Sequence, residues 1–342
     1  MKTFHHISSL LLWKDSSVRM VAGRWTLLGL FLFSACLSHA QTARTWDDGK
    51  NGKDDWSEKN NWSNNNEPDK ADEVATFAGG NAGSTSIEID EDLRTGGIRF
   101  NSDLTIASLT FTNSSKELSI RSGGASYGIS NDSTKVITFQ NEMKIEADMT
   151  WASTHASGGS MVFENTIDTD GNDLTFLTTN ALNTITLGGE IKDGNIIKSG
   201  AGTLNYNMAS NDYTGSTTVQ AGLLNLQTGG GDDGILGALI IGDSVGAANT
   251  ATLKLIDSNG ISNQSAVTVN SDGKWDVNGK QDTVGSIAGS GNITLGSGSD
   301  LRTGGNNNST TFSGVISGAG TLMKIGSGNQ TLSGTSANTY SG

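Results

Sequence analysis

The stretch IKSGAGTL at residues 197–204, followed by NDYTG at residues 211–215, recurs near the end of the chain. The second copy reads MKIGSG at residues 323–328 and NTYSG at residues 338–342. Glycine and asparagine favour sharp corners, and the short apolar pieces between them are typical of strands. Self-similarity of this kind indicates a solenoid of stacked coils. The matching positions are Lys198 and Lys324, Gly200 and Gly326, Gly202 and Gly328, Tyr213 and Tyr340, and Gly215 and Gly342.

The first copy continues past Tyr213 into the strand-like stretch 217–226, whereas the second copy stops at Gly342. We therefore expect this chain to be a carboxyl-terminally truncated fragment. An unpaired strand ladder at that end would favour association with other copies of the chain.

Strand-like pieces also recur about every dozen residues between residues 83 and 187. In Ser86–Asp90 and Leu104–Thr112, for example, polar and apolar residues alternate between turn-forming residues. The chain has 46 Gly and one Pro in 342 residues, which disfavours long helices and excludes a collagen triple helix. Three short strands with their corners predict a coil of about 20–30 residues.

These motifs resemble the autotransporter-associated β-strand repeat family over about residues 185–226 and 311–342. The resemblance implies an all-β fold, a right-handed parallel β-helix, here expected over residues 81–342. It also implies a surface-exposed passenger whose membrane-anchoring β-barrel would lie beyond the residues of this chain. Residues 83–184 resemble the family only in their succession of short strand-like pieces and do not match its motif.

Residues 41–80 are rich in tryptophan and asparagine, and we interpret them as a cap on the first coil. Trp46, Trp56 and Trp62 admit two interpretations. Their rings could pack against the coil, or they could stack on sugar rings in a carbohydrate-binding surface.

Residues 1–40 have the pattern of a signal peptide, and the start is either Met1 or Met20. Arg24 precedes an apolar run of residues 25–37, and small residues end the pattern just before Gln41. This pattern predicts export, to the extracellular space or the outer surface of a Gram-negative-type bacterium. Lipidation of Cys36 is the alternative.

The formal net charge of −13 disfavours nucleic-acid partners and anionic lipid surfaces. Contact with a membrane is therefore expected only through an anchor beyond Gly342 or a lipid on Cys36. No cofactor or metal is predicted.

Three groups of residues are candidates for a catalytic or metal site. Ser244 in the stretch IGDS resembles a lipase-like nucleophile, but its only histidine partner after residue 40 would be His155, which precedes it. The stretch Asp168–Asp173 departs from a calcium loop, because Asp and Thr stand where Gly and Glu are needed. The acidic residues Asp47, Asp48, Asp54 and Asp55 lack strand spacing. We therefore predict corners, turns and a solvated loop at these places.

The predicted function is that of a secreted or cell-surface structural or adhesive protein without catalytic activity, with surface glycans or other copies of itself as partners. One alternative is carbohydrate binding through the tryptophan segment. The other is a β-helix enzyme that degrades polysaccharides, which would need clustered acids on one face.

Overall fold

The structure is a computed structural model that describes residues 41–47, 54–79, 85–121, 127–208, 210–229, 231 and 233–342. The predicted signal peptide at residues 1–40, with Met20 and Cys36, lies outside the described residues, as does Asp48.

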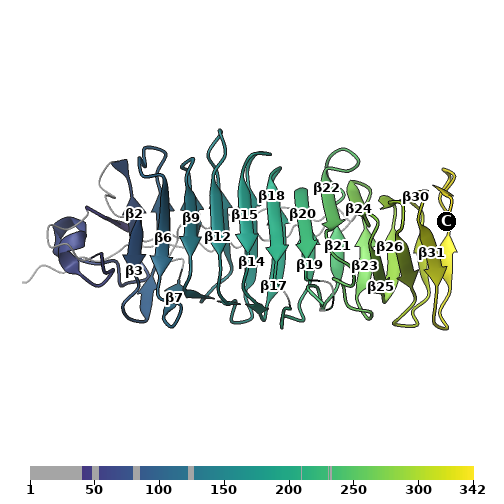
Figure 1. Cartoon of the computed structure of the whole chain (residues 1–342), viewed down its shortest axis with the longest axis horizontal. Helices are drawn as coiled ribbons and strands as arrows, with labels where there is room; N and C mark the ends of the chain where they lie inside the picture. The colour runs from purple at the N-terminus through teal and green to yellow at the C-terminus, as the bar shows by residue number, and fades with distance from the viewer. Residues whose placement is uncertain are drawn as a thin grey trace, which may run out of the picture. The chain divides into compact units, whose positions relative to one another are not determined.

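The described residues form a parallel β-solenoid of about 11 turns (Figure 1). Strands from successive coils lie side by side, and their register pairs are parallel throughout the long sheets. Paired residues on neighbouring coils are 22, 20 and 24 positions apart in three side-chain hydrogen bonds between coils. The prediction of an all-β, parallel solenoid with coils of this length is confirmed.

The first sheet has 13 strands and runs along one side of the solenoid. Its strands are β1 (Thr42–Thr45), β2 (Glu73–Phe77), β5 (Gly97–Phe100), β8 (Ile129–Asn131), β11 (Met149–Ser153), β14 (Asp173–Thr178), β17 (Asn195–Ser199), β19 (Thr217–Val219), β21 (Leu239–Ile241), β23 (Ala266–Val269), β26 (Ser286–Gly289), β29 (Thr310–Phe312) and β32 (Gln330–Leu332).

The second sheet has 12 strands. They are β3 (Ser86–Glu88), β6 (Ser108–Thr112), β9 (Val136–Phe139), β12 (Ser160–Phe163), β15 (Thr184–Leu187), β18 (Thr203–Asn207), β20 (Gly222–Gln227), β22 (Ala251–Leu255), β24 (Gly273–Asp276), β27 (Asn292–Leu295), β30 (Val315–Gly318) and β33 (Thr339–Tyr340).

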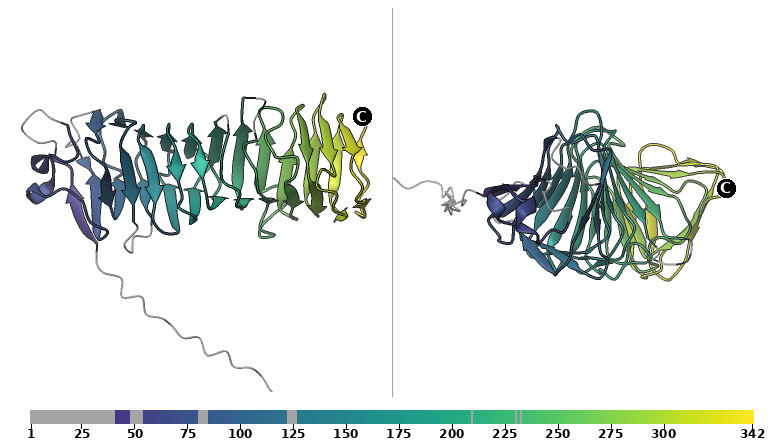
Figure 2. Two further views of the ribbon diagram at one scale, coloured as in Figure 1. Left: turned by 90° about the horizontal axis from the view of Figure 1, so that it is seen from below. Right: turned by 60° about the vertical axis from the view of Figure 1, so that its left-hand side comes forward.

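The third side of the solenoid carries two shorter sheets, of five and three strands. They are formed by β4 (Leu93–Thr95), β7 (Glu117–Ile120), β10 (Glu142–Ile145), β13 (Ile167–Asp168) and β16 (Ile191–Lys192), and by β25 (Gln281–Val284), β28 (Asp300–Thr303) and β31 (Thr321–Lys324). Between β16 and β25, three consecutive coils have no third strand among the described residues. Figure 2 shows the stacked coils from two further directions.

The core consists of columns of inward side chains, one from each coil. In the first sheet Trp151 pairs with Phe176, and both are fully buried. Trp151 also stacks on Phe163 with ring centroids 4.6 Å apart, and Phe163 stacks on Phe139 at 5.0 Å. Each such buried ring contributes about 1.5–3 kcal/mol through removal of apolar surface from water. These columns hold the coils in register.

Polar side chains also stack from coil to coil. Asn225 Nδ2 donates to Asn205 Oδ1 at 2.9 Å, and these two residues are register partners in β20 and β18. Ladders of this kind fix the outward side chains of neighbouring coils at the spacing of the strands, which is roughly 4.8 Å.

The amino-terminal segment adds two short 3-10 helices, η1 (Lys59–Asn61) and η2 (Ser63–Asn65). Its residue Trp56 donates its backbone N–H to Glu88 O at 2.8 Å, which joins the segment to β3. Within the described part of the chain, no helix has both the length and the apolar character needed to cross a membrane.

Candidate functional site

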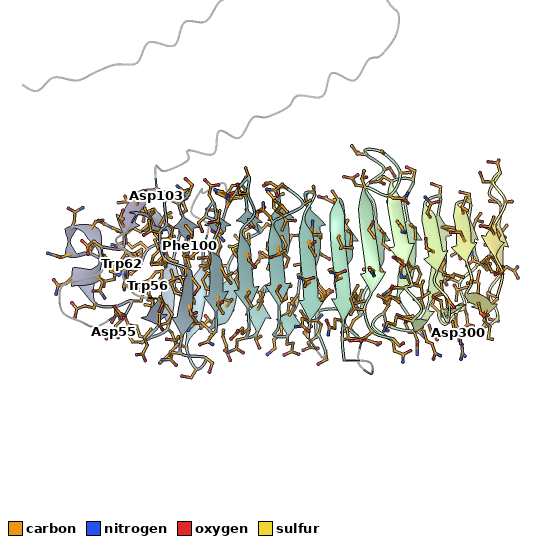
Figure 3. All side chains as sticks on the ribbon, turned by 45° about the horizontal axis from the view of Figure 1, so that its top comes forward. Asp55, Trp56, Trp62, Phe100, Asp103 and Asp300 are labelled. Atoms are coloured by element: carbon orange, nitrogen blue, oxygen red, sulfur yellow. The ribbon has the colours of Figure 1, made fainter. Side chains whose placement is uncertain are left out.

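The three tryptophans of the amino-terminal segment form one buried aromatic cluster. Trp46, Trp56 and Trp62 each have 0% of their surface exposed. The ring centroids of Trp46 and Trp62 are 5.0 Å apart and those of Trp56 and Trp62 are 4.8 Å apart, all packed around Phe77. Figure 3 labels Trp56 and Trp62 at this end of the solenoid. Because no ring face is open to solvent, the geometry favours packing over sugar stacking at these residues.

The repeat-motif lysine of the first copy is an inward residue. Lys198 lies between Phe176 and Val219 in a core column of the first sheet and is fully buried. Its ammonium Nζ donates to the backbone carbonyls of Ser199, Gly200 and Ala221 at 2.8, 2.6 and 2.9 Å. Burial lowers the pKa of Lys198 to about 7. The side chain therefore ties one coil to the next.

The motif glycines stand where a side chain would collide with the preceding coil. Gly200 has φ +75°, and a Cβ there would lie 2.3 Å from Thr178 O. A Cβ on Gly215 would lie 1.9 Å from Gly194 O. Equivalent close approaches occur at Gly202, Gly326, Gly328 and Gly342. These glycines are needed for the close stacking of the coils.

The motif tyrosine of the first copy is a core residue. Tyr213 is fully buried, and its hydroxyl shares a hydrogen bond of 2.6 Å with Thr217 Oγ1. Its counterpart Tyr340 is only partly buried and packs against the edge of the core. The motif residues of the first copy, which are Lys198, Gly200, Gly202, Tyr213 and Gly215, therefore all have structural contacts.

The stretch IGDS at residues 241–244 forms a coil corner after β21. The backbone N–H groups of Asp243 and Ser244 donate to the Asp272 carboxylate at 3.3 and 2.8 Å, and Ser244 has φ +67°. His155 Nδ1 accepts the Ser157 backbone N–H at 3.0 Å, within a turn of its own. The geometry therefore does not bring a nucleophile and its base together.

The stretch Asp168–Asp173 is a turn held by side chains of the two neighbouring coils. Asp168 and Asp170 lie 3.7 and 3.5 Å from Lys144 Nζ, and Asp173 Oδ1 accepts from Asn195 Nδ2 at 2.8 Å. Over the described ranges, no group of three or more His, Cys, Asp or Glu residues is arranged to hold a metal ion.

One buried carboxyl was not anticipated from the sequence. Asp282, in β25, is 2% exposed. Burial raises the pKa of its carboxyl to about 8, an effect that backbone N–H groups of Thr283, Ile261 and Gly260 partly offset.

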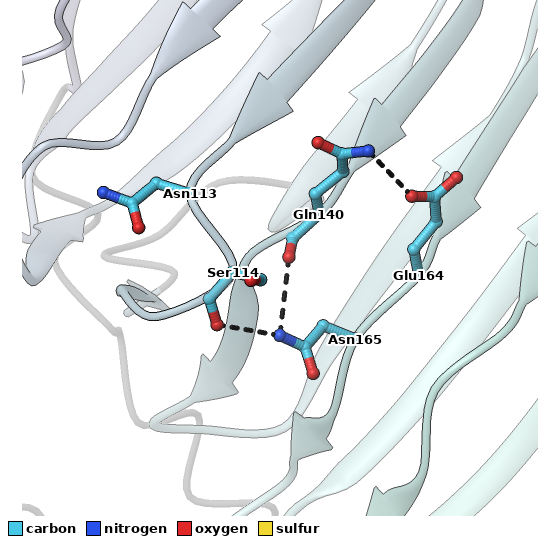
Figure 4. Close-up of a pocket in the computed structure, with 5 residues that line it drawn as sticks. All are labelled: Asn113, Ser114, Gln140, Glu164 and Asn165. Atoms are coloured by element: carbon cyan, nitrogen blue, oxygen red, sulfur yellow. Dashed lines mark hydrogen bonds between the residues drawn. The ribbon is translucent and has the colours of Figure 1, made fainter.

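A polar hollow of about 600 Å³ lies at the corner that follows the strands of the second sheet (Figure 4). Gln140 and Glu164 follow the register partners Phe139 and Phe163, so they are equivalent residues on neighbouring coils. Gln140 Nε2 donates to Glu164 Oε2 at 3.0 Å. Asn165 Nδ2 donates to Ser114 O at 3.0 Å and more weakly to Gln140 O at 3.4 Å. Asn113 completes the lining.

A second hollow of about 370 Å³ lies farther along the same sheet. It is lined by Thr186, Asn205, Tyr206, Asn207, Asn225, Gln227 and Ile256. Asn207 and Gln227 are register partners in β18 and β20. Both hollows are lined mainly by carboxamide and hydroxyl groups. The first contains one carboxylate, that of Glu164, whereas glycoside hydrolysis uses a pair.

Comparison with known proteins connects the chain to one large bacterial adhesin. It is 33% identical over 169 residues, 48% of this chain, to the protein "Adhesin BmaC autotransporter" of Brucella suis biovar 1 (strain 1330). The matched segment spans 4% of the length of that relative. No family model matches the chain, and no solved structure matches it. The resemblance to the β-strand repeat family therefore stays a prediction, while the β-solenoid agrees with a passenger-type architecture.

Proposed function

We propose that this chain is part of an adhesive β-solenoid displayed on the outer surface of a Gram-negative-type bacterium. The observation that carries the proposal is the identity of 33% over 169 residues with an autotransporter adhesin. The stacked coils support it, because a solenoid presents extended, repetitive outer faces for contact with another surface. The signal peptide predicted at residues 1–40 belongs to this proposal.

The proposed role is mechanical and adhesive rather than catalytic. Trp46, Trp56 and Trp62 act as the core of the amino-terminal cap in this proposal. Surface glycans or further copies of the chain are the proposed partners. The acidic net charge of −13 favours partners that are neutral or positively charged over nucleic acids or anionic lipids.

Attachment of coated beads tests the proposal. The exported form of the full chain is coupled to inert beads, and beads coated with the same protein after heat unfolding are the matched control. We expect the folded coating to increase attachment to bacterial or host-cell surfaces, or aggregation of the beads, several-fold over the control. Equal behaviour of the two coatings would contradict an adhesive function.

A further inference from the structure

One coil between the two polar hollows carries a glycine whose backbone does not require glycine. Leu187 pairs with Phe163 on the preceding coil and with Tyr206 on the following coil. The next residue, Gly188, therefore stands at the position equivalent to Glu164 and to Asn207. Its N–H donates to Phe163 O at 2.7 Å, which continues the ladder to this position.

Gly188 differs from the motif glycines in its surroundings. A Cβ on Gly188 would lie 3.5 Å from Phe163 O and 3.7 Å from Glu164 Cα, which are ordinary contacts, and its φ is not in the left-handed region. By contrast, a Cβ on the adjacent Gly189 would lie 2.1 Å from Asn165 O. Neither strain nor crowding explains the missing side chain of Gly188. The absence of a side chain at Gly188 leaves the exposed corner between the two hollows open.

We propose that the two hollows and the open position at Gly188 form a continuous edge trough that binds a linear, neutral glycan chain. The trough is defined by the equivalent positions Gln140, Glu164, Gly188, Asn207 and Gln227, together with the linings of the two hollows. Four coil steps at the spacing of adjacent strands make it roughly 19 Å long. This inference deepens the proposed adhesive function by naming a ligand class.

The lining selects for hydroxyl groups. Carboxamides donate and accept hydrogen bonds at once, as vicinal sugar hydroxyls do, and Gln140, Asn207 and Gln227 repeat this chemistry along the axis. The contact between Gln140 Nε2 and Glu164 Oε2 orients both side chains before a ligand arrives. A polymer that runs along the solenoid axis meets carboxamides on three of the five coils, which a small compact ligand does not.

Charge and polarity argue against other polymers. Glu164 is the single charged side chain among the residues that line the two hollows, and the chain carries a net charge of −13. Polyanions such as acidic glycans and nucleic acids are therefore repelled. The large apolar side chains in the linings are Tyr206, which is fully buried, and Ile256, so apolar peptide side chains find little surface to cover.

The test measures binding of the exported full chain to immobilised short linear oligosaccharides of neutral hexoses, of N-acetylhexosamines and of uronic acids. The Gly188→Leu variant places a side chain across the trough without backbone strain. The Thr218→Leu variant adds the same side chain on the outer face of the first sheet, in β19, and is the matched control. Circular dichroism and thermal unfolding verify that both variants fold.

We expect the wild-type chain and Thr218→Leu to bind a neutral chain equally, and Gly188→Leu to bind it about tenfold more weakly because several hydrogen bonds are lost. A Gln140→Ala, Asn207→Ala double variant, which widens the trough, should weaken binding to a similar extent. The inference is overturned if no neutral oligosaccharide binds, if only the uronic acids bind, or if Gly188→Leu binds as the wild type does.

The same variants separate this inference from the adhesive function. If the wild-type chain binds no glycan but beads coated with Gly188→Leu still attach to cells, glycan binding by the trough is contradicted and the adhesive function is not. If the wild-type chain binds a glycan, Gly188→Leu abolishes that binding and wild-type beads do not attach to cells, the adhesive function is contradicted and glycan binding by the trough is not.

Discussion

The two copies of the repeat motif have similar local contacts in different surroundings. Asn211 Oδ1 accepts the Ile191 N–H at 2.8 Å, and Asn338 Oδ1 accepts the Ile316 N–H at the same distance. Lys324 donates to the carbonyls of Ile325 and Gly326, as Lys198 does to those of its own two following residues. The motif therefore encodes corner hydrogen bonds that form within a coil and with the coil before it.

Burial distinguishes the copies. Lys198 and Tyr213 are fully buried, and the next coil, through Ala221 and Val219, contacts Lys198. Lys324, in the last described coil, is exposed, and Tyr340 is partly buried. The motif therefore sets the geometry of a corner, whereas its contribution to stability depends on the coil that follows it in the stack.

The largest expected difference between the copies concerns the tyrosines. Tyr213→Ala removes a fully buried ring and should lower the free energy of unfolding by about 3–5 kcal/mol, as for other buried aromatic residues. Tyr340→Ala should lower it by only about 1 kcal/mol, because that ring is partly exposed. Urea unfolding followed by circular dichroism, with hydrogen exchange to locate the affected coils, measures both. Equal losses would show that the neighbouring coil does not set the energetic difference.

The motif lysine should make stability depend on pH. Because burial lowers the pKa of Lys198 to about 7, the folded chain binds fewer protons than the unfolded chain between about pH 7 and the ordinary lysine value. Below pH 7 the folded state carries the full energetic cost of the buried ammonium charge. This cost decreases as the pH rises through the window and the buried amine loses its proton. The free energy of unfolding of the wild type relative to Lys198→Met should therefore rise with pH, by at most about 1.4 kcal/mol per pH unit.

Urea unfolding of the wild type and Lys198→Met across that pH range tests this dependence. Lys324→Met is the matched control for loss of the same side chain at an exposed corner. A difference between wild type and Lys198→Met that stays constant from pH 7 to pH 10 would contradict the lowered pKa of the buried ammonium.

The smallest expected difference concerns the asparagines. Asn211→Ala leaves the Ile191 N–H and Gly234 O without their side-chain partners, which lie at 2.8 and 2.6 Å, and should cost about 1–3 kcal/mol. Asn338→Ala removes one such contact at a more exposed place and should cost about 1 kcal/mol or less. Hydrogen exchange of the Ile191 and Ile316 amides provides a local measurement. A larger increase in exchange at Ile316 upon Asn338→Ala than at Ile191 upon Asn211→Ala would reverse the proposed order.

The solenoid could be predicted from the sequence because its signals are local. Alternating residues such as those of β14 and β15 predict strands one at a time, and the glycines of the motif predict the corners between them. The cap interpretation of Trp46, Trp56 and Trp62 agrees with their full burial, because these large rings occur where the first coil needs cover.

The remaining features depend on register between coils, which the sequence does not state. The inward position of Lys198 is visible in hindsight, because it alternates with buried Ile196 in β17. The charge of Lys198 argued against a core position, and its three carbonyl partners come partly from another coil. Likewise, Glu164, Gly188 and Asn207 are far apart in sequence and share an edge only after the coils are stacked. The burial of Asp282 has the same origin.

The interrupted third side has a mechanical consequence. In a parallel solenoid the ladder hydrogen bonds run along the long axis, so tension along that axis loads them directly and separates the coils one after another. Between β16 and β25 the third side of the coils has no continuous ladder over the described residues, and it is joined there by the isolated parallel bridge Ile235–Ile261 and single backbone hydrogen bonds. Under constant tension we expect these coils to separate first. The chain would then lengthen there, while the aromatic-rich amino-terminal coils keep their ladder hydrogen bonds.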